Sequence, residues 1–191
     1  MNNSKLQPIK KSLTRPAAKM THANTNRILK VNHAGEHGAV HIYTGQILIA
    51  RFTAPAMLAE LREFKAHEEK HRALFAAELQ RRACRPCRSA FLCAAGGFVL
   101  GLVTGLFGRH AIAATTVAVE RVVLQHLQTQ LAALADVDDA ALKVIAAIVA
   151  EEQLHHDQSA AHLDKLSLCS KSLQTLVSGA TEAVIWTGMR V

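Results

Sequence analysis

The sequence predicts an all-α protein, a four-helix bundle built from two helical hairpins with extra apolar helices. Length and composition support this prediction. The chain has 191 residues, half of them hydrophobic but only 4% aromatic, and it contains only 10 Gly and 4 Pro. Sandwiches and barrels need many turns and β-branched strands, whereas a chain rich in Ala and Leu favours helices. This length fits one domain with a sizeable core.

A basic arm precedes the first predicted helix. Residues 1–31 contain seven Lys or Arg and no acid, so these residues carry the whole formal charge of +7 and the rest of the chain has fifteen charges of each sign. We assign residues 1–26 to a flexible arm and residues 27–191 to the folded domain. A solvated terminus is the simplest interpretation, and attraction to anionic lipid or an organellar targeting segment are alternatives. We expect no nucleic-acid partner, since no aromatic residues interleave with the basic ones.

The first hairpin spans about residues 26–83. A helix over 26–52 is followed by "TAP", residues 53–55, which supplies an N-cap and a Pro in the first turn of the second helix. "CRPCR" then breaks the chain. Its Cys84 and Cys87 have the C-x-x-C spacing, but a thioredoxin-type site needs a βαβ setting that is absent here, so we expect incidental thiols. Four cysteines without a signal-peptide pattern suggest a reducing compartment.

Residues 89–108, "SAFLCAAGGFVLGLVTGLFG", contain no charge. Gly97, Gly101 and Gly105 form a G-x-x-x-G-x-x-x-G row that lets another backbone approach closely. We favour a membrane-contact segment that inserts into one membrane face; a buried core or oligomer contact is the alternative, and a true span is least favoured because of the five glycines. The arginines at 81, 82, 85 and 88 stand where they could meet lipid headgroups.

The second hairpin follows Arg109 and His110. A helix runs to about residue 135, and "DVDD", residues 136–139, forms a turn with helix-starting acids. The next helix is expected to end near Leu166. A last helical segment over about 170–187 closes the chain.

Two Glu–Glu–His triplets repeat along the chain at one spacing. Glu36 is followed 32 residues later by Glu68, with His71 three positions on; the triplet Glu120, Glu152 and His155 repeats this pattern at a constant offset of 84. Each predicted turn lies near the midpoint of its pair of glutamates. With a rise of ~1.5 Å per residue in both arms, each hairpin returns its second Glu to the height of its first.

The two triplets together place four Glu and two His in the middle of the bundle. This is the ligand set of ferritin-like di-iron or di-manganese carboxylate proteins. Oxygen-rich ligation with one imidazole per metal suits iron or manganese, whereas a structural zinc site favours Cys and His. Glu120 supports the same interpretation, because a buried carboxylate in a nearly uncharged stretch needs a neutralising partner.

"HEEKH", residues 67–71, also fits the zinc-protease pattern H-E-x-x-H, in which two His hold Zn²⁺ and the Glu is a general base. The 84-residue offset argues against it. It makes Glu68 a ligand, and it leaves His67 without a counterpart, since Glu151 stands at the matching place. We therefore treat His67 as incidental to the site.

Four stretches of the chain carry a resemblance to a known family. "RILKVNHAGEHGAVHIYTGQ" (27–46), "HEEKH", "TVAVE" (116–120) and "EEQLHHD" (151–157) resemble the demethoxyubiquinone hydroxylases of ubiquinone biosynthesis. The resemblance implies a ferritin-like di-iron monooxygenase that uses O₂ to hydroxylate the ring of a 2-polyprenyl-3-methyl-6-methoxy-1,4-benzoquinone. By motif match, Glu68 and Glu152 are the bridging ligands of both irons, and the full ligand set is Glu36, Glu68, His71, Glu120, Glu152 and His155.

The same resemblance implies partners and a location. One oxygen atom leaves as water, so two electrons must come from a partner reductase, from NADH or from the reduced quinone, and the sequence has no G-x-G-x-x-G nucleotide fingerprint. Other ubiquinone-biosynthesis proteins and further copies of the chain are implied partners. The implied location is peripheral membrane association, on the cytoplasmic face of the cell membrane in a bacterium or the matrix side of the mitochondrial inner membrane in a eukaryote.

Two further polar residues are candidates for supporting the ligands. His126 lies inside an apolar helix and Asp157 follows a predicted ligand by two positions; a core histidine and a solvated face are the alternatives. Rival functions are a ferritin-like iron-binding or peroxidase protein without quinone hydroxylation, a helical scaffold at a membrane surface, and a zinc protease.

Overall fold

Helices account for nearly all of residues 21–163 and 168–190, the part of the chain that the computed structural model describes. No strand occurs among these residues, so the all-α prediction is confirmed. The elements are α1 (His22–Thr53), the short 3₁₀ helix η1 (Pro55–Met57), α2 (Leu58–Arg81), α3 (Ala90–Leu106), α4 (Arg109–Leu134), α5 (Asp139–Ala146), α6 (Val149–Ala161) and α7 (Leu168–Gly188).

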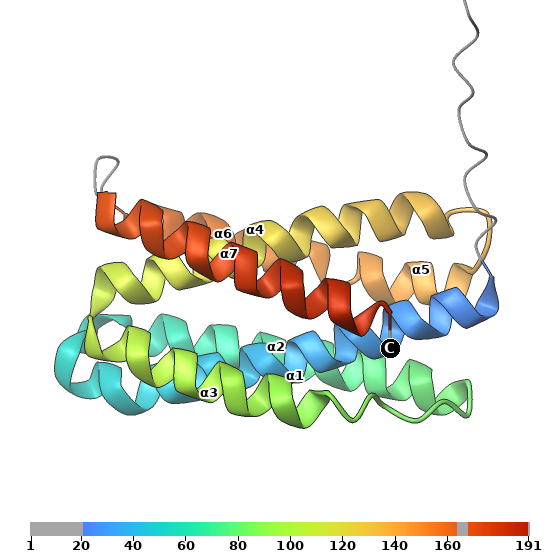
Figure 1. Ribbon diagram of the computed structural model, residues 1–191, viewed down its shortest axis with the longest axis horizontal. Helices are drawn as coiled ribbons and strands as arrows, with labels where there is room; N and C mark the ends of the chain where they lie inside the picture. Colours follow the sequence, from blue (N-terminus) through green and yellow to red (C-terminus); the bar gives the residue numbers. More distant parts are fainter. Residues whose placement is uncertain (1–20, 164–167, 191) are drawn as a thin grey trace, which may run out of the picture.

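Two hairpins form the bundle. The first consists of α1 and α2, and the second of α4 with α5 and α6 in line (Figure 1). The extra apolar helices cover the bundle from outside: α3 runs along α1, and α7 crosses α4 and ends beside α1 (Figure 1). The basic arm proposed for residues 1–26 lies mostly outside the described residues. Its last five residues form the first turns of α1, whose start is capped by the Thr21 side chain accepting from Asn24 N.

Glycines let α3 approach α1 closely. A Cβ on Gly97 would meet the carbonyl of Gly38, and one on Gly101 would meet the carbonyl of Ile42. On the facing helix, a Cβ on Gly45 would lie 2.6 Å from the carbonyl oxygen of Phe98. The partner of the predicted glycine row is thus the first helix of the same chain.

The sequence predicts the helix cap at the turn of the second hairpin but not the one at the turn of the first. Asp138 caps α5 as expected, since its side chain accepts from Ala141 N at 3.1 Å. Thr53 is not the predicted N-cap of the second helix. Its hydroxyl instead donates to the carbonyl of Gly105 at 2.7 Å and so joins the end of α1 to the end of α3.

The single helix predicted after "DVDD" is two helices. α5 ends at Ala146, and α6 begins at Val149 after a turn over residues 147 and 148. Ile148 at this break is fully buried in the apolar cluster of residues beside α5. The end predicted near Leu166 is also wrong, because α6 ends earlier, at Ala161 with His162 as its C-cap.

Two apolar clusters fill the bundle core, one toward each end. One packs Leu29 and Phe75 against Leu127 and Ile145; the other packs Tyr43 and Phe64 against Ile112. On α1, α2 and α4 the predicted ligands lie between the residues of the two clusters. The ligands therefore lie between two apolar clusters that hold the surrounding helices together.

The outer face of α3 is apolar and exposed. Phe91 and Leu92 in α3 and Phe107 directly after it are 79%, 77% and 77% exposed. None of the helices in the described part of the chain combines the length and hydropathy needed to cross a membrane. For Arg82, the prediction of contact with lipid headgroups is wrong. Its side chain is nearly buried and pairs with Asp138 and Glu78 at 2.7 and 2.6 Å.

Candidate metal centre

Four helices bring the six predicted ligands to one place. Each hairpin contributes a Glu from its first helix and a Glu-x-x-His pair from the other, so the residues come from α1, α2, α4 and α6. All six are buried, and the largest exposed fraction among them is 6%, for Glu36. The spacing of 32 residues within each hairpin therefore does align the side chains across each pair of helices.

The six residues form two overlapping groups. Glu36 and His71 join Glu68 and Glu152 in one group, while Glu120 and His155 join the same Glu68 and Glu152 in the other. In each group, one ligand atom from every residue lies within 4.8 Å of all the others, a spacing that could hold a metal ion. Glu68 and Glu152 belong to both groups, so they occupy the shared middle.

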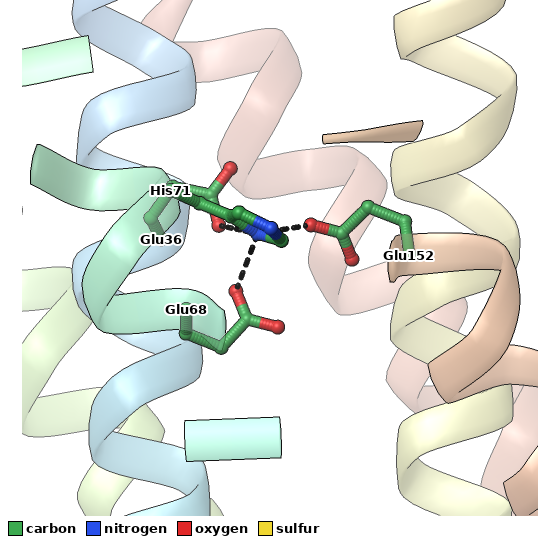
Figure 2. Close-up of side chains that lie close together, drawn as sticks. All are labelled: Glu36, Glu68, His71 and Glu152. Carbon is green, nitrogen blue, oxygen red and sulfur yellow. Dashed lines mark ion pairs between the residues drawn. The ribbon is translucent and has the colours of Figure 1, made fainter. Parts of the chain in front are cut away.

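The Nδ1 atoms of both His face this middle. His71 Nδ1 lies 2.9 Å from Glu152 Oε1 and 3.9 Å from the nearest oxygens of Glu36 and Glu68 (Figure 2). His155 Nδ1 lies 3.1 Å from Glu68 Oε1 and 3.7 Å from Glu152 Oε2. Donor atoms from both hairpins therefore converge on the same place.

These inward atoms have no hydrogen bonds. His71 Nδ1, His155 Nδ1, Glu68 Oε1 and Glu152 Oε1 are all buried without a hydrogen-bond partner among the described residues. Leaving such atoms unsatisfied costs about 1–3 kcal/mol each, and more for charged groups. A pair of cations would satisfy all four at once, so the donor set fits two metal ions of the iron or manganese type.

Electrostatics in the centre favour bound cations. Burial, and then the neighbouring carboxylates, raise the pKa of Glu36 and of Glu120 well above the ordinary carboxyl value. Burial by itself lowers the pKa of His71 and His155, but the close carboxylates of Glu152 and Glu68 raise it to about 10 and about 9. Protons are thus held where cations would bind, and a metal ion must displace them.

The outward Nε2 atom of each His has a partner. His71 Nε2 lies 2.8 Å from Glu151 Oε2, and Lys70 pairs with the other oxygen of Glu151 at 2.6 Å. His155 Nε2 lies 3.0 Å from His67 Nδ1. His67, expected to be incidental, therefore contacts a predicted ligand directly. The signal available in the sequence was the offset of 84 that relates position 67 to position 151.

Two aromatic residues complete the surroundings. The Tyr43 hydroxyl donates to Glu120 Oε1 at 3.2 Å, and Tyr43 itself is buried. Phe64 packs on the His155 ring with centroids 4.4 Å apart. The sequence does not predict the contact between Tyr43 and Glu120, because no motif or spacing links positions 43 and 120.

The two other candidates lie apart from the six ligands. His126 Nε2 contacts Glu182 Oε2 at 2.9 Å, which ties α4 to α7. Asp157 is exposed and contacts only His156 and Gln153 in its hydrogen bonds among the described residues. Cys84 and Cys87 are free thiols.

Comparisons with known proteins identify the family of this chain. A family model described as ubiquinone biosynthesis protein COQ7 matches residues 23–188. The mitochondrial NADPH-dependent 3-demethoxyubiquinone 3-hydroxylase of Dictyostelium discoideum is 35% identical over 168 residues, which cover 86% of this chain and 76% of the relative. The 3-demethoxyubiquinol 3-hydroxylase of Rhodospirillum rubrum is 34% identical over 167 residues, 87% of this chain and 78% of the relative. The sequence resemblance is thereby confirmed: the chain belongs to the COQ7 family of ubiquinone biosynthesis proteins.

Proposed function

We propose that the chain is a monooxygenase that hydroxylates the ring of a demethoxyubiquinone, 2-polyprenyl-3-methyl-6-methoxy-1,4-benzoquinone, with O₂. The observation that carries this proposal is the pair of overlapping buried Glu and His groups sharing Glu68 and Glu152. The names of the relatives supply the substrate class, because they are called 3-demethoxyubiquinone or 3-demethoxyubiquinol 3-hydroxylases.

In this proposal the centre holds two iron ions. Glu36 and His71 would hold one ion, Glu120 and His155 would hold the other, and Glu68 and Glu152, which belong to both groups, would be shared between them. The buried donor atoms without hydrogen bonds support this assignment. When bound, the iron pair supplies the reduction of O₂ that puts one oxygen atom on the ring and releases the other as water.

Residues around the ligands hold a proton in place and exclude water. Burial, followed by the charges of Glu120, Glu68 and Glu152, raises the pKa of Tyr43 well above its usual value. Tyr43 therefore stays protonated and keeps its hydroxyl directed at Glu120 Oε1. The two apolar clusters on either side of the ligands exclude water, which strengthens the interactions inside the centre.

The quinone ring is proposed to approach between α1 and α4. A small hollow there borders on Tyr43 and Glu120 and so reaches the edge of the ligand set. The residues that line it are Ala39, Ile42, Tyr43, Thr115, Thr116, Val119 and Glu120. The lining combines the apolar side chains of Ala39, Ile42 and Val119 with a few polar groups, the mixture typical of a site for a small molecule.

The polyprenyl tail implies that the substrate arrives from a bilayer. We propose that the exposed apolar face of α3 makes this peripheral contact, on the cytoplasmic face of a bacterial cell membrane or the matrix side of the mitochondrial inner membrane. Arg85 and Arg88 are exposed at the start of α3 and can meet headgroups. The same face offers a surface for other proteins of ubiquinone biosynthesis or for a second copy of the chain.

Reduction of O₂ takes four electrons. The ring C–H bond supplies two of them, and a donor must supply the other two. Some relatives are named NADPH-dependent, and others are named for the quinol, which itself carries two electrons. We propose a reduced nicotinamide as the donor, either NADPH or NADH, acting directly or through the quinol.

The proposal is tested by turnover with defined iron. Protein loaded anaerobically with Fe(II) is mixed with a demethoxyquinone, NADH or NADPH, and O₂, and the ring-hydroxylated product is measured by mass spectrometry with ¹⁸O₂. We expect one labelled oxygen per product molecule, and loss of product in Glu152→Ala. Iron oxidation without ring hydroxylation would instead support an iron-binding or peroxidase protein.

The matched control is Glu63→Ala. Glu63 is on the same helix as Glu68 but is exposed, so its removal takes a carboxylate from α2 without touching the centre. Product formation by Glu63→Ala should equal that of the wild type. Unchanged hydroxylation in Glu152→Ala contradicts the assignment.

A further inference from the structure

The two imidazoles of the centre are held from outside by residues at matching positions. His67 and Glu151 each stand immediately before the Glu of a Glu-x-x-His pair, on α2 and α6. Each contacts the His of the opposite hairpin: Glu151 reaches His71, and His67 reaches His155. The contacts therefore cross between the hairpins in both directions.

The geometry at His155 fits a hydrogen bond that orients the ring. The ring planes of His67 and His155 are within 10° of parallel, and the two nitrogens are 3.0 Å apart. With a metal ion at Nδ1 of His155, the ring's proton is on Nε2, which donates to Nδ1 of His67. This bond, with Phe64 against the ring, sets the rotation that aims Nδ1 at the shared carboxylates.

The two outer partners differ in chemistry. Glu151 offers His71 a carboxylate oxygen, while His67 offers His155 a ring nitrogen. A hydrogen bond to a carboxylate is stronger and makes the donating imidazole a better metal ligand. A second contact adds to the difference. Tyr43 donates a hydrogen bond to Glu120, which would bind the same metal ion as His155, and so withdraws negative charge from that ligand.

We propose that His67 is the positioning residue of the His155 ligand, and that the exchange of imidazole for carboxylate at this position makes the two metal sites unequal. The site of Glu36 and His71 binds its iron more tightly than the site of Glu120 and His155. This inference rests on the di-iron centre proposed above, but not on its activity toward quinones.

The test is to measure Fe(II) binding without oxygen. Titration gives the two affinities, and ⁵⁷Fe Mössbauer spectroscopy distinguishes the two iron sites. Wild-type protein should bind two Fe(II) with two distinct affinities and give two distinct quadrupole doublets. His67→Ala should weaken the weaker site roughly 10- to 100-fold and leave the tighter one nearly unchanged. His67→Gln, which keeps an acceptor, should restore most of the lost affinity, and His67→Glu should bring the two affinities and the two doublets together.

His126→Gln is the matched control, since His126 contacts Glu182 on α7 rather than a ligand. It should leave both affinities and both doublets as in the wild type. Wild-type affinities and doublets in both His67→Ala and His67→Glu would overturn the role of His67. Failure of the wild type to bind two Fe(II) would overturn the di-iron centre itself, which is a different result. Circular dichroism of each variant ensures that only folded protein is compared.

Discussion

Nδ1 of His71 lies 2.9 Å from Oε1 of Glu152 across the two hairpins, yet both atoms are buried and neither has a hydrogen-bond partner in the described part of the chain. The contact brings together residues from α2 and α6 that are 81 positions apart. A buried polar pair in this state is costly unless a further group satisfies it. The stability of the fold, the binding of metal ions and the protonation of His71 and Glu152 therefore all depend on this contact.

The shared position of Glu152 predicts unequal effects of ligand removal. Glu152 belongs to both groups and Glu36 to one. Glu152→Ala should weaken both Fe(II) affinities, each by at least roughly tenfold, whereas Glu36→Ala should weaken only one. Anaerobic titration measures both variants, with the exposed Glu63→Ala as control. Loss of only one affinity in Glu152→Ala would contradict a bridging role.

The raised pKa values predict that the metal-free protein loses stability as pH rises. His side chains titrate near 6.5 when unfolded, but the folded pKa is about 9 for His155 and about 10 for His71. The folded state holds these protons more tightly, so the stabilisation is complete below pH 6.5 and is lost as pH rises through 9 to 10. The raised pKa values of Glu36 and Glu120 act with the same sign.

Thermal unfolding of chelator-treated protein, followed by circular dichroism between pH 6.5 and 9, measures this effect. We expect Tm to fall across this window, and we expect a smaller slope when Fe(II) or Mn(II) is bound. His33 and His37 have lowered pKa values and act with the opposite sign below pH 6.5, outside the window. A Tm that rises with pH in metal-free protein would contradict the prediction.

The sequence predicts the centre well because helical geometry is regular. A constant rise converts the spacing from Glu36 to Glu68 into equal heights on paired helices, so local periodicity is sufficient. The cross-hairpin partners are different, because no local rule links His67 to His155 or Tyr43 to Glu120. They depend on how the two hairpins face each other.

The same distinction holds for the fold. No Gly or Pro marks the break between α5 and α6 in the sequence, and the residue at the break, Ile148, is fully buried. The glycine row at 97, 101 and 105 predicts a close helix contact but not which helix supplies it. Thr53 likewise bonds to Gly105, a residue 52 positions away that no capping rule includes.

The contact between α1 and α3 predicts opposite effects for two Gly→Ala variants. A Cβ on Gly101 would meet the Ile42 carbonyl, whereas nothing lies within 4 Å of a Cβ on Gly96. Gly101→Ala should cost about 1–3 kcal/mol of unfolding free energy through overpacking. Gly96→Ala should gain about 0.5–1 kcal/mol, since Ala favours helices over Gly. Urea unfolding measures both, and equal effects would contradict the close approach of the helices.

The exposed face of α3 predicts binding to lipid vesicles. A Leu or Phe side chain gains about 1.5–3 kcal/mol on full burial, so three such residues give appreciable affinity even when partly inserted. The triple variant Phe91→Ser, Leu92→Ser and Phe107→Ser should reduce sedimentation with anionic phospholipid vesicles by more than ~10-fold. Val137→Ser is the matched control, since Val137 is exposed and apolar but lies in the turn after α4. Tm should change little in either variant, because the replaced side chains are exposed. Equal sedimentation of the wild type and the triple variant would rule out α3 as the membrane contact, and added salt would then show how far the basic residues account for binding.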